Sequence, residues 1–585
     1  MRAWWIAAAL AAVAGLAESD QTIHDGFDEL VAEYERFRAE SDPIRSGRRG
    51  DLSAAARWPD ASRQAVAARN RREAEFLARL DEIDPGALDS NREASYIVLD
   101  YLLRSATRLA PFEPERIPFT NDSGFFSTPL TVAASMRLAS VDAAEAWLKR
   151  LDALPTYLAQ HQAWLKKGID DGFVQPRYVV EQVLEQLEAI AAMAPARSPL
   201  MAPFDTLPPG VDRTGGPALR ARGLALVEDR VLPAYAELIK FMRQRYLAAA
   251  RESIGISAVP RGRAYYRALV EYHTTLDTTP KAIHERGRTE VARIRAEMEA
   301  LIDELDFDGD FAAFLSFMRT DERFYADSEE ELLREAAWIA KRADDAMPEL
   351  FGRLPRLPYG VRAVPAHMAP TYTTGRYWPG DSDSGVAGGY MVNTHALDQR
   401  PLYALPALTL HEAVPGHHHQ IALSQEMADL PQFRRDTYIT AFGEGWGLYA
   451  ERLGVEMGIY TTPYEHFGRL TYEMWRACRL VVDTGIHYFD FSREQAEACL
   501  LENSALAPHN VRTEVARYIA FPGQALAYKP GELLIRDLRA RAESELGTSF
   551  DIRAFHDHLL AEGAMPLNAL SRRMTAWIEA RASER

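Results

Sequence analysis

The sequence predicts a predominantly helical protein, because most segments repeat apolar residues at the helical period and short breaks with Pro or Gly separate them. Residues 280–304 are the clearest case, since Thr279 can cap this helix and Pro280 suits its first position. Similar periods occupy about 61–82, 91–106, 141–165, 176–195, 217–250, 329–345, 532–545 and 567–582. Because no repeat or low-complexity linker interrupts the chain, we expect one large helical domain over 18–585.

Residues 355–410 are the exception to the helical pattern. Pro and Gly are dense there, and aromatic and β-branched residues replace the helical period, as in 388–394. We therefore expect a small region of short strands and loops. It lies directly before the segment of the chain that is richest in histidine.

The composition excludes several classes of function. The 585 residues include 67 Lys+Arg and 84 Asp+Glu, a formal charge of -17, which argues against a nucleic-acid partner because phosphate binding needs clustered basic residues. The two cysteines, Cys478 and Cys499, are too few for a disulfide scaffold or a cysteine-rich zinc module. Whether they pair with each other is left open by the sequence.

The first residues predict export. Arg2 precedes a short apolar run over 3–14, and small residues follow, which is the pattern of a signal peptide over 1–17. The alternative is an uncleaved anchor, but the run is shorter than the roughly 20 residues of a spanning helix. No cysteine lies at the cleavage point, so a lipoprotein is not expected. We expect a periplasmic or secreted protein with no membrane contact beyond the signal peptide.

A cluster of histidines follows the strand and loop region. His411 and Glu412 are adjacent, and His417, His418 and His419 follow within the same nine residues. In the His-Glu-x-x-His pattern of zinc peptidases, two histidines on one helix face bind the ion and the Glu accepts a proton from water. The sequence therefore predicts a zinc site with Glu412 as the general base.

The spacing of these histidines departs from that pattern. The fourth position after His411 is Pro415, which cannot bind a metal. A regular helix would bring His418 back to the face of His411, whereas a break at Pro415 and Gly416 could turn His417 there instead. Both remain open, as does a histidine-rich helix end that binds no metal.

A third metal ligand is expected from the segment 441–452. Glu444 and Glu451 are seven residues apart and so share one helix face, from which Glu451 could orient a ligand or bind the substrate. Glu444 follows His411 by 33 residues, a separation that suits two antiparallel helices. Glycines at 443, 445 and 447 destabilise a helix by about 1 kcal/mol each, a cost that a close helix contact beside a site would explain. The alternative for Glu444 is a surface carboxylate.

Two later segments carry further candidate residues. Arg479, Asp483 and His487 recur every four residues, as a polar stripe that either orients ligands and substrate or forms an internal ion-pair ladder. Tyr528 or Lys529 could donate a hydrogen bond to the oxyanion of a tetrahedral intermediate, although their segment also fits a plain turn between helices. The expected catalytic segment spans 370–530.

These motifs resemble a large bacterial family, domain of unknown function 885. The resemblance rests on the segments 411–418, 444–451, 479–487 and 522–529, and on 265–266, 273–275 and 389–394. It extends over roughly 25–580 of the chain.

The family in turn looks like a distant relative of the helical gluzincin peptidases, of the neurolysin and angiotensin-converting-enzyme type. That resemblance implies zinc held by His411, His417 and Glu444, a substrate strand at 389–394, which includes Asn393, and Tyr528 as the residue that assists the oxyanion.

The expected function is that of an exported hydrolase with one zinc ion, which cleaves peptide or peptide-like amide bonds. Two alternatives stay open: a peptide-binding protein with a similar cleft but no turnover, and a metal-dependent hydrolase of other amides or esters. An exopeptidase needs a charged group for the end of its substrate, and Arg476, Arg479 or Lys529 could supply it. Sequence reasoning does not choose among them.

Overall fold

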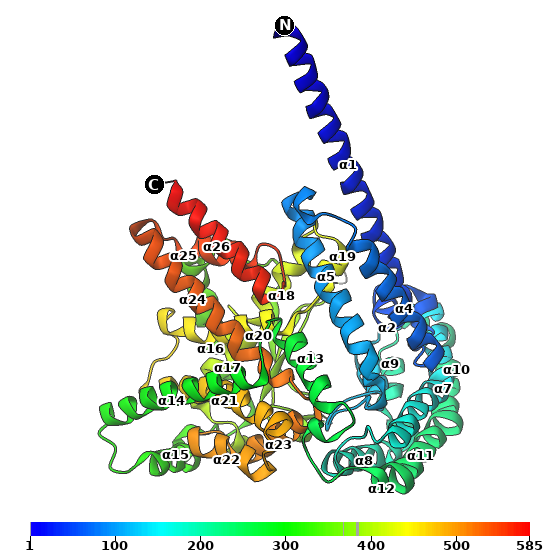
Figure 1. Ribbon diagram of the computed structural model, residues 1–585. Helices are drawn as coiled ribbons and strands as arrows, with labels where there is room; N and C mark the ends of the chain where they lie inside the picture. The colour runs from blue at the N-terminus through cyan, green and yellow to red at the C-terminus, as the bar shows by residue number, and fades with distance from the viewer. Residues whose placement is uncertain (1, 367, 382–384, 585) are drawn as a thin grey trace. The chain divides into compact units, whose positions relative to one another are not determined.

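The computed structural model describes residues 2–366, 368–381 and 385–584, with side chains from residue 22 onward except at 371. Its elements are helices apart from one small sheet, so the prediction of a predominantly helical fold is confirmed (Figure 1). The predicted signal peptide, 1–17, lies outside the residues whose side chains are described and stays a prediction. No helix in the described part of the chain is long and apolar enough to cross a membrane.

The chain divides into two compact units. The first runs to Ile254 and adds Ala258–Arg261, and the second comprises Gly255–Ser257 and everything from Gly262 onward. The single domain expected over 18–585 stays a prediction, because compactness does not test whether each unit folds alone. All candidate site residues belong to the second unit.

The first unit is built from helices alone among its named elements. Its helices are α1 (Arg2–Ser41), α2 (Pro43–Arg48), α3 (Leu52–Ala55), α4 (Arg63–Leu80), α5 (Ser90–Leu109), α6 (Thr128–Ser135), α7 (Val141–Asp171), α8 (Arg177–Ala192), α9 (Ala202–Asp205), α10 (Pro209–Leu226), α11 (Leu232–Phe241) and α12 (Leu247–Ala249). The pattern at 217–250 thus becomes α10–α12, which π-helical turns at Val227–Val231 and Met242–Tyr246 join.

The second unit contains the remaining helices and the sheet. Its helices are α13 (Gly262–Thr274), α14 (Pro280–Glu304), α15 (Phe311–Thr320), α16 (Glu329–Leu350), α17 (Leu405–Glu412), α18 (His417–Glu426), α19 (Gln432–Asp436), α20 (Thr440–Glu456), α21 (Pro463–Tyr488), α22 (Arg493–Asn503), α23 (Pro508–Ala520), α24 (Tyr528–Leu546), α25 (Ile552–Leu560) and α26 (Leu567–Ser583). Helix α14 starts as predicted, because the side chain of Thr279 accepts a hydrogen bond from the N–H of Ala282.

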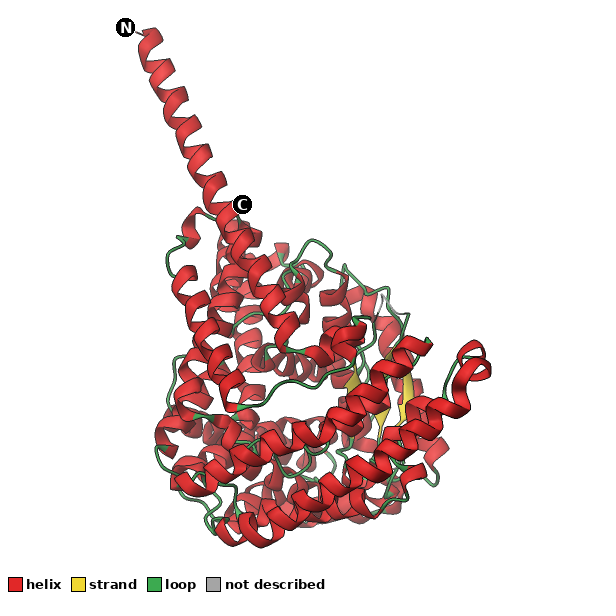
Figure 2. Cartoon of the chain, turned by 90° about the vertical axis from the view of Figure 1, so that its right-hand side faces the viewer, coloured by secondary structure: helices red, strands yellow, loops and turns green. Residues whose placement is uncertain are grey.

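The expected strand and loop region forms a three-stranded sheet, drawn in yellow among the red helices in Figure 2. Strand β3 (Gly388–Val392) lies in the middle, with β1 (Tyr359–Ala363) parallel on one side and β2 (Gly375–Trp378) antiparallel on the other. All five residues of β3 are buried. Because β3 is central, β1 and β2 are the edge strands of the sheet. After β3 the chain continues to α17.

A buried ion network joins α14, α21 and α24. The Nζ of Lys529, which is 0% exposed, lies 2.8 Å from carboxylate oxygens of both Glu473 and Glu532 and 3.6 Å from Glu290. Arg293 also contacts Glu473. These buried charges stabilise the fold only while each keeps its partners, because an unpaired charge away from water is costly.

Cys478 and Cys499 connect α21 to α22. Both are free thiols, and their sulfur atoms lie 3.2 Å apart. The structure thus brings together the two cysteines whose proximity the sequence left open.

The ion network predicts that Lys529→Met destabilises the protein by about 3–5 kcal/mol, because Glu473 and Glu532 lose their shared buried cation. Urea unfolding of both proteins measures the difference. Lys341→Met is the matched control, since the Lys341 side chain is 75% exposed and its removal is expected to cost less than about 0.5 kcal/mol. Equal stability of the two variants would contradict the importance of the network.

Candidate metal centre

The histidine segment folds as two helices separated by a sharp turn. Helix α17 ends at Glu412 and α18 begins at His417, so the helix is interrupted at Pro415 and Gly416. Proline lacks the N–H that a continuing helix needs, and the indole N–H of Trp446 donates to the carbonyl of Pro415 at 2.7 Å. The break turns His417, and not His418, toward His411.

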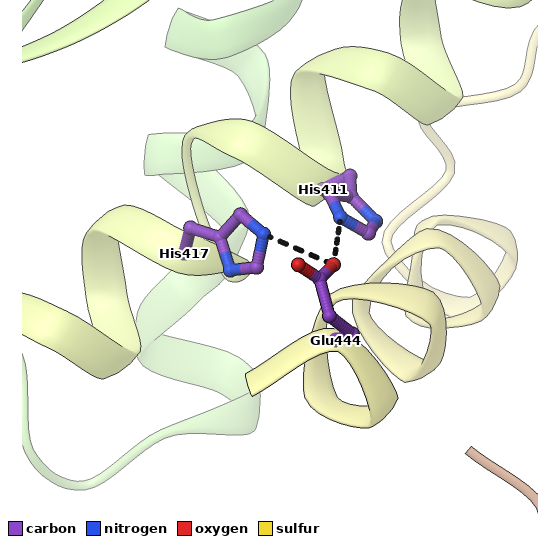
Figure 3. A group of neighbouring side chains, drawn as sticks. All are labelled: His411, His417 and Glu444. Atoms are coloured by element: carbon purple, nitrogen blue, oxygen red, sulfur yellow. Dashed lines mark ion pairs between the residues drawn. The ribbon is translucent and has the colours of Figure 1, made fainter. Parts of the chain in front are cut away.

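His411, His417 and Glu444 converge on one point (Figure 3). One oxygen of Glu444 lies 3.3 Å from Nε2 of His411 and 3.5 Å from Nε2 of His417. The ligand atoms of all three residues lie within 4.8 Å of one another. Of the alternatives left open by the sequence, the break at Pro415 is the one that the structure adopts.

Glycines on α20 allow this close approach. A Cβ at Gly447 would lie 2.6 Å from the ring of His411, and one at Gly445 would lie 2.5 Å from the backbone of Gly531 on α24. Both distances are shorter than real Cβ contacts, so α20 can pack against α17 and α24 only with glycine here. The close helix contacts thus explain why α20 contains glycines that lower its intrinsic helix stability, as the sequence predicted.

The second ring nitrogen of His411 is held by Glu451. Its Nδ1 lies 2.8 Å from the carboxylate of Glu451, whose same oxygen lies 3.1 Å from a guanidinium nitrogen of Arg476. A carboxylate on one ring nitrogen fixes the orientation of the imidazole and directs the other nitrogen at a metal. Glu451 therefore orients His411, which is one of the roles that the sequence predicts for it.

The charges of the site favour cations. Burial lowers the pKa of His411, but hydrogen bonds to Glu444 and Glu451 raise it to about 10. Burial raises the pKa of Glu444, but the two histidines outweigh it and hold that pKa well below its ordinary range. Because the pKa of His411 is raised, a proton competes with a metal ion for its ring nitrogen.

Glu412 is held by the edge strand. The backbone N–H of Tyr377 in β2 donates to one of its carboxylate oxygens at 2.7 Å. Glu412 as a whole is 7% exposed, and it follows His411 directly in the chain. Strand β2 thus fixes the side chain of the predicted general base.

His418 points into different surroundings. Its Nδ1 pairs with the hydroxyl of Tyr377 at 3.0 Å, and its ring packs against Tyr359 with centroids 4.5 Å apart. Burial lowers the pKa of His418 to about 4, so it is a neutral side chain in the core. His418 was the alternative ligand, and the structure does not bring it to the cluster.

Strand β3, followed directly by Asn393, was expected to hold the substrate backbone, but the structure does not leave it available for that role. Both edges of β3 are already paired with neighbouring strands, so its backbone has no free edge for a substrate. The amide of Asn393 donates to the carbonyls of Ala369, Tyr372 and Thr373, which ties down the loop before β2. The strand with a free edge beside Glu412 is β2.

Tyr528, at the start of α24, packs against Leu448, which lies one turn after Glu444 on α20. The guanidinium of Arg479 lies 4.0 Å from the centre of its ring, and Arg517 donates to its hydroxyl at 3.4 Å. Burial and the charge of Glu444 raise the pKa of Tyr528, but Arg517 and Arg479 outweigh them and lower it below 10.

The contacts of the polar stripe on α21 reach other segments of the chain. Arg479 bonds to Tyr518 and Glu514 on α23. Asp483 accepts from the hydroxyl of Tyr266 at 2.6 Å and from the N–H of Gly523. His487 lies 2.8 Å from the carbonyl of Tyr518 and accepts from the N–H of Ile256. The stripe thus holds helix α23 and the turn at Gly523, which leads to Tyr528.

Lys529 requires a correction. Its ammonium is fully buried among three carboxylates, so it can neither donate to an oxyanion nor bind the end of a substrate. Sequence reasoning missed the ion network because its members come from three distant helices.

The site also includes residues that sequence reasoning missed. The hydroxyl of Tyr438 donates to Glu444 at 3.3 Å, and Tyr438 is 44% exposed. Arg517 and the backbone of Tyr377 were missed as well. None of these three residues lies in a metal-binding sequence pattern. Tyr438 comes six residues before Glu444, and this proximity in the chain could have identified it as a neighbour of the site.

The arrangement predicts that His417→Gln abolishes stoichiometric zinc binding whereas His418→Gln retains it, because only His417 faces Glu444. Zinc content after dialysis against a metal buffer measures the difference. The neighbouring histidine provides the matched control, since both variants lose one imidazole from the same helix. Loss of zinc in His418→Gln alone would contradict the assignment.

A second prediction concerns Asp483. Burial raises its pKa to about 7, despite hydrogen bonds from Tyr266 and Gly523 that lower it. Because an unfolded Asp titrates near 3.9, the native state binds more protons between these values, and stability falls as the pH rises from about 4 to about 7. Asp483→Asn removes this loss, which amounts to at most about 4 kcal/mol.

Urea unfolding at pH 5 and pH 8 tests this prediction. The wild type is expected to lose more stability than Asp483→Asn over this interval. Asp537→Asn, at an exposed position on α24, is expected to follow the wild type. A loss in Asp483→Asn as large as that of the wild type would contradict the raised pKa.

Comparisons with known proteins agree with this fold. A protein from Colwellia psychrerythraea, described as a "putative lipoprotein", has a solved structure that matches with a TM-score of 0.86 and 27% identity, over 95% of this chain and 99% of that chain. Another, from Shewanella oneidensis and described as a "putative lipoprotein of unknown function", matches with a TM-score of 0.72 and 18% identity, over 94% of this chain and 99% of that chain. A search of the curated proteins finds no match.

The family assignment rests on a separate comparison. The profile of the family described as "Bacterial protein of unknown function (DUF885)" matches residues 43–574, which is most of the chain. The resemblance expected from the motifs around His411, Glu444 and Tyr528 is thereby confirmed at the level of this family. The chain belongs to the bacterial family of unknown function DUF885.

Proposed function

We propose that this protein is an exported zinc-dependent hydrolase that cleaves peptide or peptide-like amide bonds. The observation that carries the proposal is the geometry of His411, His417 and Glu444. Two imidazoles and one carboxylate from the protein are a usual ligand set of catalytic zinc, which keeps a further position open.

The distances in the cluster favour a metal site over a set of ion pairs. Charge-assisted hydrogen bonds between nitrogen and carboxylate oxygen are about 2.7–2.9 Å long, as the 2.8 Å contact between His411 and Glu451 is. The contacts of Glu444 with His411 and His417, at 3.3 and 3.5 Å, are longer. Ligand atoms around a tetrahedral zinc with bonds of about 2.0–2.1 Å lie about 3.3–3.4 Å apart, which these contacts match.

Glu412 is the proposed general base. When bound, zinc lowers the pKa of water and polarises a carbonyl group. The N–H of Tyr377 holds one oxygen of Glu412, and the second oxygen can accept a proton from the attacking water and pass it to the leaving nitrogen. Burial at 7% exposure keeps this carboxylate in one orientation beside His411.

Tyr528 is the proposed donor to the oxyanion. Its hydroxyl receives a hydrogen bond from Arg517, so its own proton remains available for a developing negative charge. The positive charges of Arg517 and Arg479, which lower the pKa of Tyr528, also favour negative charge on an oxyanion beside its hydroxyl. The hydroxyl of Tyr438 donates to Glu444, so it holds the carboxylate that is the proposed third ligand.

The resemblance to gluzincin peptidases supports the same roles. In that group two histidines come from one helical segment and a glutamate from a following helix, as His411, His417 and Glu444 do here, although a break displaces the second histidine. The predicted signal peptide supports export, as does the description of the Colwellia protein as a "putative lipoprotein", since lipoproteins are exported.

The proposal predicts that Glu412→Gln retains one zinc ion but loses peptidase activity by about 100-fold or more, because the general base is removed while the ligands remain. Purified wild type and variant are loaded with zinc, and cleavage of a peptide mixture is followed by mass spectrometry. Glu299→Gln, an exposed position on α14, is the control and is expected to keep full activity.

The other outcomes separate the alternative functions. Peptide affinity without cleavage in the wild type would favour a binding protein. Cleavage of acyl-amides or esters but not peptides would favour a different hydrolase. A wild type that takes up no zinc would overturn the metal site itself.

A further inference from the structure

We propose that Arg479 and Arg517 bind the C-terminal carboxylate of the substrate, so that the protein acts as an exopeptidase on the free carboxyl end of peptides. This inference rests on the proposed hydrolase function. These two arginines are cations near Tyr528 whose positive charge is not fully balanced by carboxylates.

The other two cations suggested by the sequence are already neutralised. Lys529 is enclosed by Glu290, Glu473 and Glu532. Arg476 pairs with Glu451, which in turn holds His411, and it also donates to the carbonyl of Tyr472. Lys529 would have to abandon these contacts to bind a substrate, and the charge of Arg476 is already balanced by Glu451.

Arg479 and Arg517 carry a surplus of positive charge. Among the residues that the structure describes, Glu514 is the one carboxylate in ion-pair distance of either guanidinium, at 3.0 Å from Arg479 and 3.9 Å from Arg517. Two cations therefore share one buried anion. An additional carboxylate would bring this group to neutrality.

The hydrogen-bonding capacity of the pair is also incomplete. Arg479 is 2% exposed, and its Nη1 has no hydrogen-bond partner within the described part of the chain. A buried N–H without an acceptor costs free energy, which a bound carboxylate oxygen would recover. Arg517, whose side chain is 20% exposed, makes a 2.8 Å bond to Gln524 and a long 3.4 Å contact with Tyr528.

The position of the pair suits the end of a substrate. The guanidinium of Arg479 lies 4.0 Å from the centre of the Tyr528 ring. Tyr528 also packs with Leu448, which lies one turn from Glu444. A peptide whose scissile carbonyl meets Tyr528 would thus have its nearby carboxyl end close to two guanidiniums. Arginine binds carboxylates through two parallel N–H bonds, which gives this recognition its specificity.

The test compares one peptide in two forms. An N-acetylated tripeptide with a free C-terminal carboxylate and its C-terminal amide are offered to the zinc-loaded protein. We expect kcat/KM to favour the carboxylate form by about tenfold or more, mainly through KM. Arg517→Met is expected to reduce this preference, whereas Arg512→Met, an exposed arginine on the same helix, is expected to keep it.

The ratio of the two rates separates recognition from structural damage. A general loss of folding or of Tyr528 alignment lowers both rates together and leaves their ratio unchanged, which would overturn the role of Arg517. Equal cleavage of both peptides by the wild type would overturn the inference while leaving the proposed hydrolase function intact.

Binding provides a readout that does not depend on turnover. If the wild type cleaves neither peptide, the hydrolase proposal fails, and calorimetry on zinc-loaded Glu412→Gln still tests the carboxylate site with the same pair. Tighter binding of the carboxylate form by about tenfold, lost in the double variant with Arg517→Met, supports the site. Equal affinity for both forms, or no binding of either, overturns it.

Discussion

The carboxylate of Glu444, placed between the rings of His411 and His417, is the interaction on which the rest of the site depends. The three residues of this cluster come from α17, α18 and α20, and two local features of the chain allow them to meet. The break at Pro415 turns His417, and Gly447 leaves space for the ring of His411. Pro415 and Gly447 both disfavour a regular helix, and both are explained by the need to bring His411, His417 and Glu444 together.

A second group of contacts positions the residues around Tyr528. The stripe on α21 holds α23 and the turn after it. The guanidinium of Arg479 packs against the ring of Tyr528. Buried polar contacts of this kind restrict the turn to one conformation because each donor and acceptor must keep its partner. The buried ion network at Lys529 fixes the same helix, α24, against α14 and α21.

Much of this fold could be predicted from the sequence, because helical periods and caps are local properties. Helix α14 begins at Pro280 as expected, and the strand region falls where Pro and Gly accumulate. The site could be predicted only in part. The choice between His417 and His418 depended on the backbone at Pro415, which no residue pattern specifies.

The errors concerned contacts between distant segments. Lys529 was expected near a substrate, yet its partners Glu290 and Glu473 lie on helices far from it in the chain. Strand β3 was expected to hold the substrate backbone, but it pairs with β1 on one side and β2 on the other, so those two strands form the edges of the sheet. Arg517 was missed because its importance arises from contacts with Glu514 and Tyr528, which no residue pattern specifies.

The most direct test of the central claim is an anomalous diffraction experiment at the zinc absorption edge on crystals of the zinc-loaded protein. The account predicts one strong anomalous peak between Nε2 of His411, Nε2 of His417 and the carboxylate of Glu444. A zinc-loaded crystal with no peak at that point, or with its peak at His418, would contradict it.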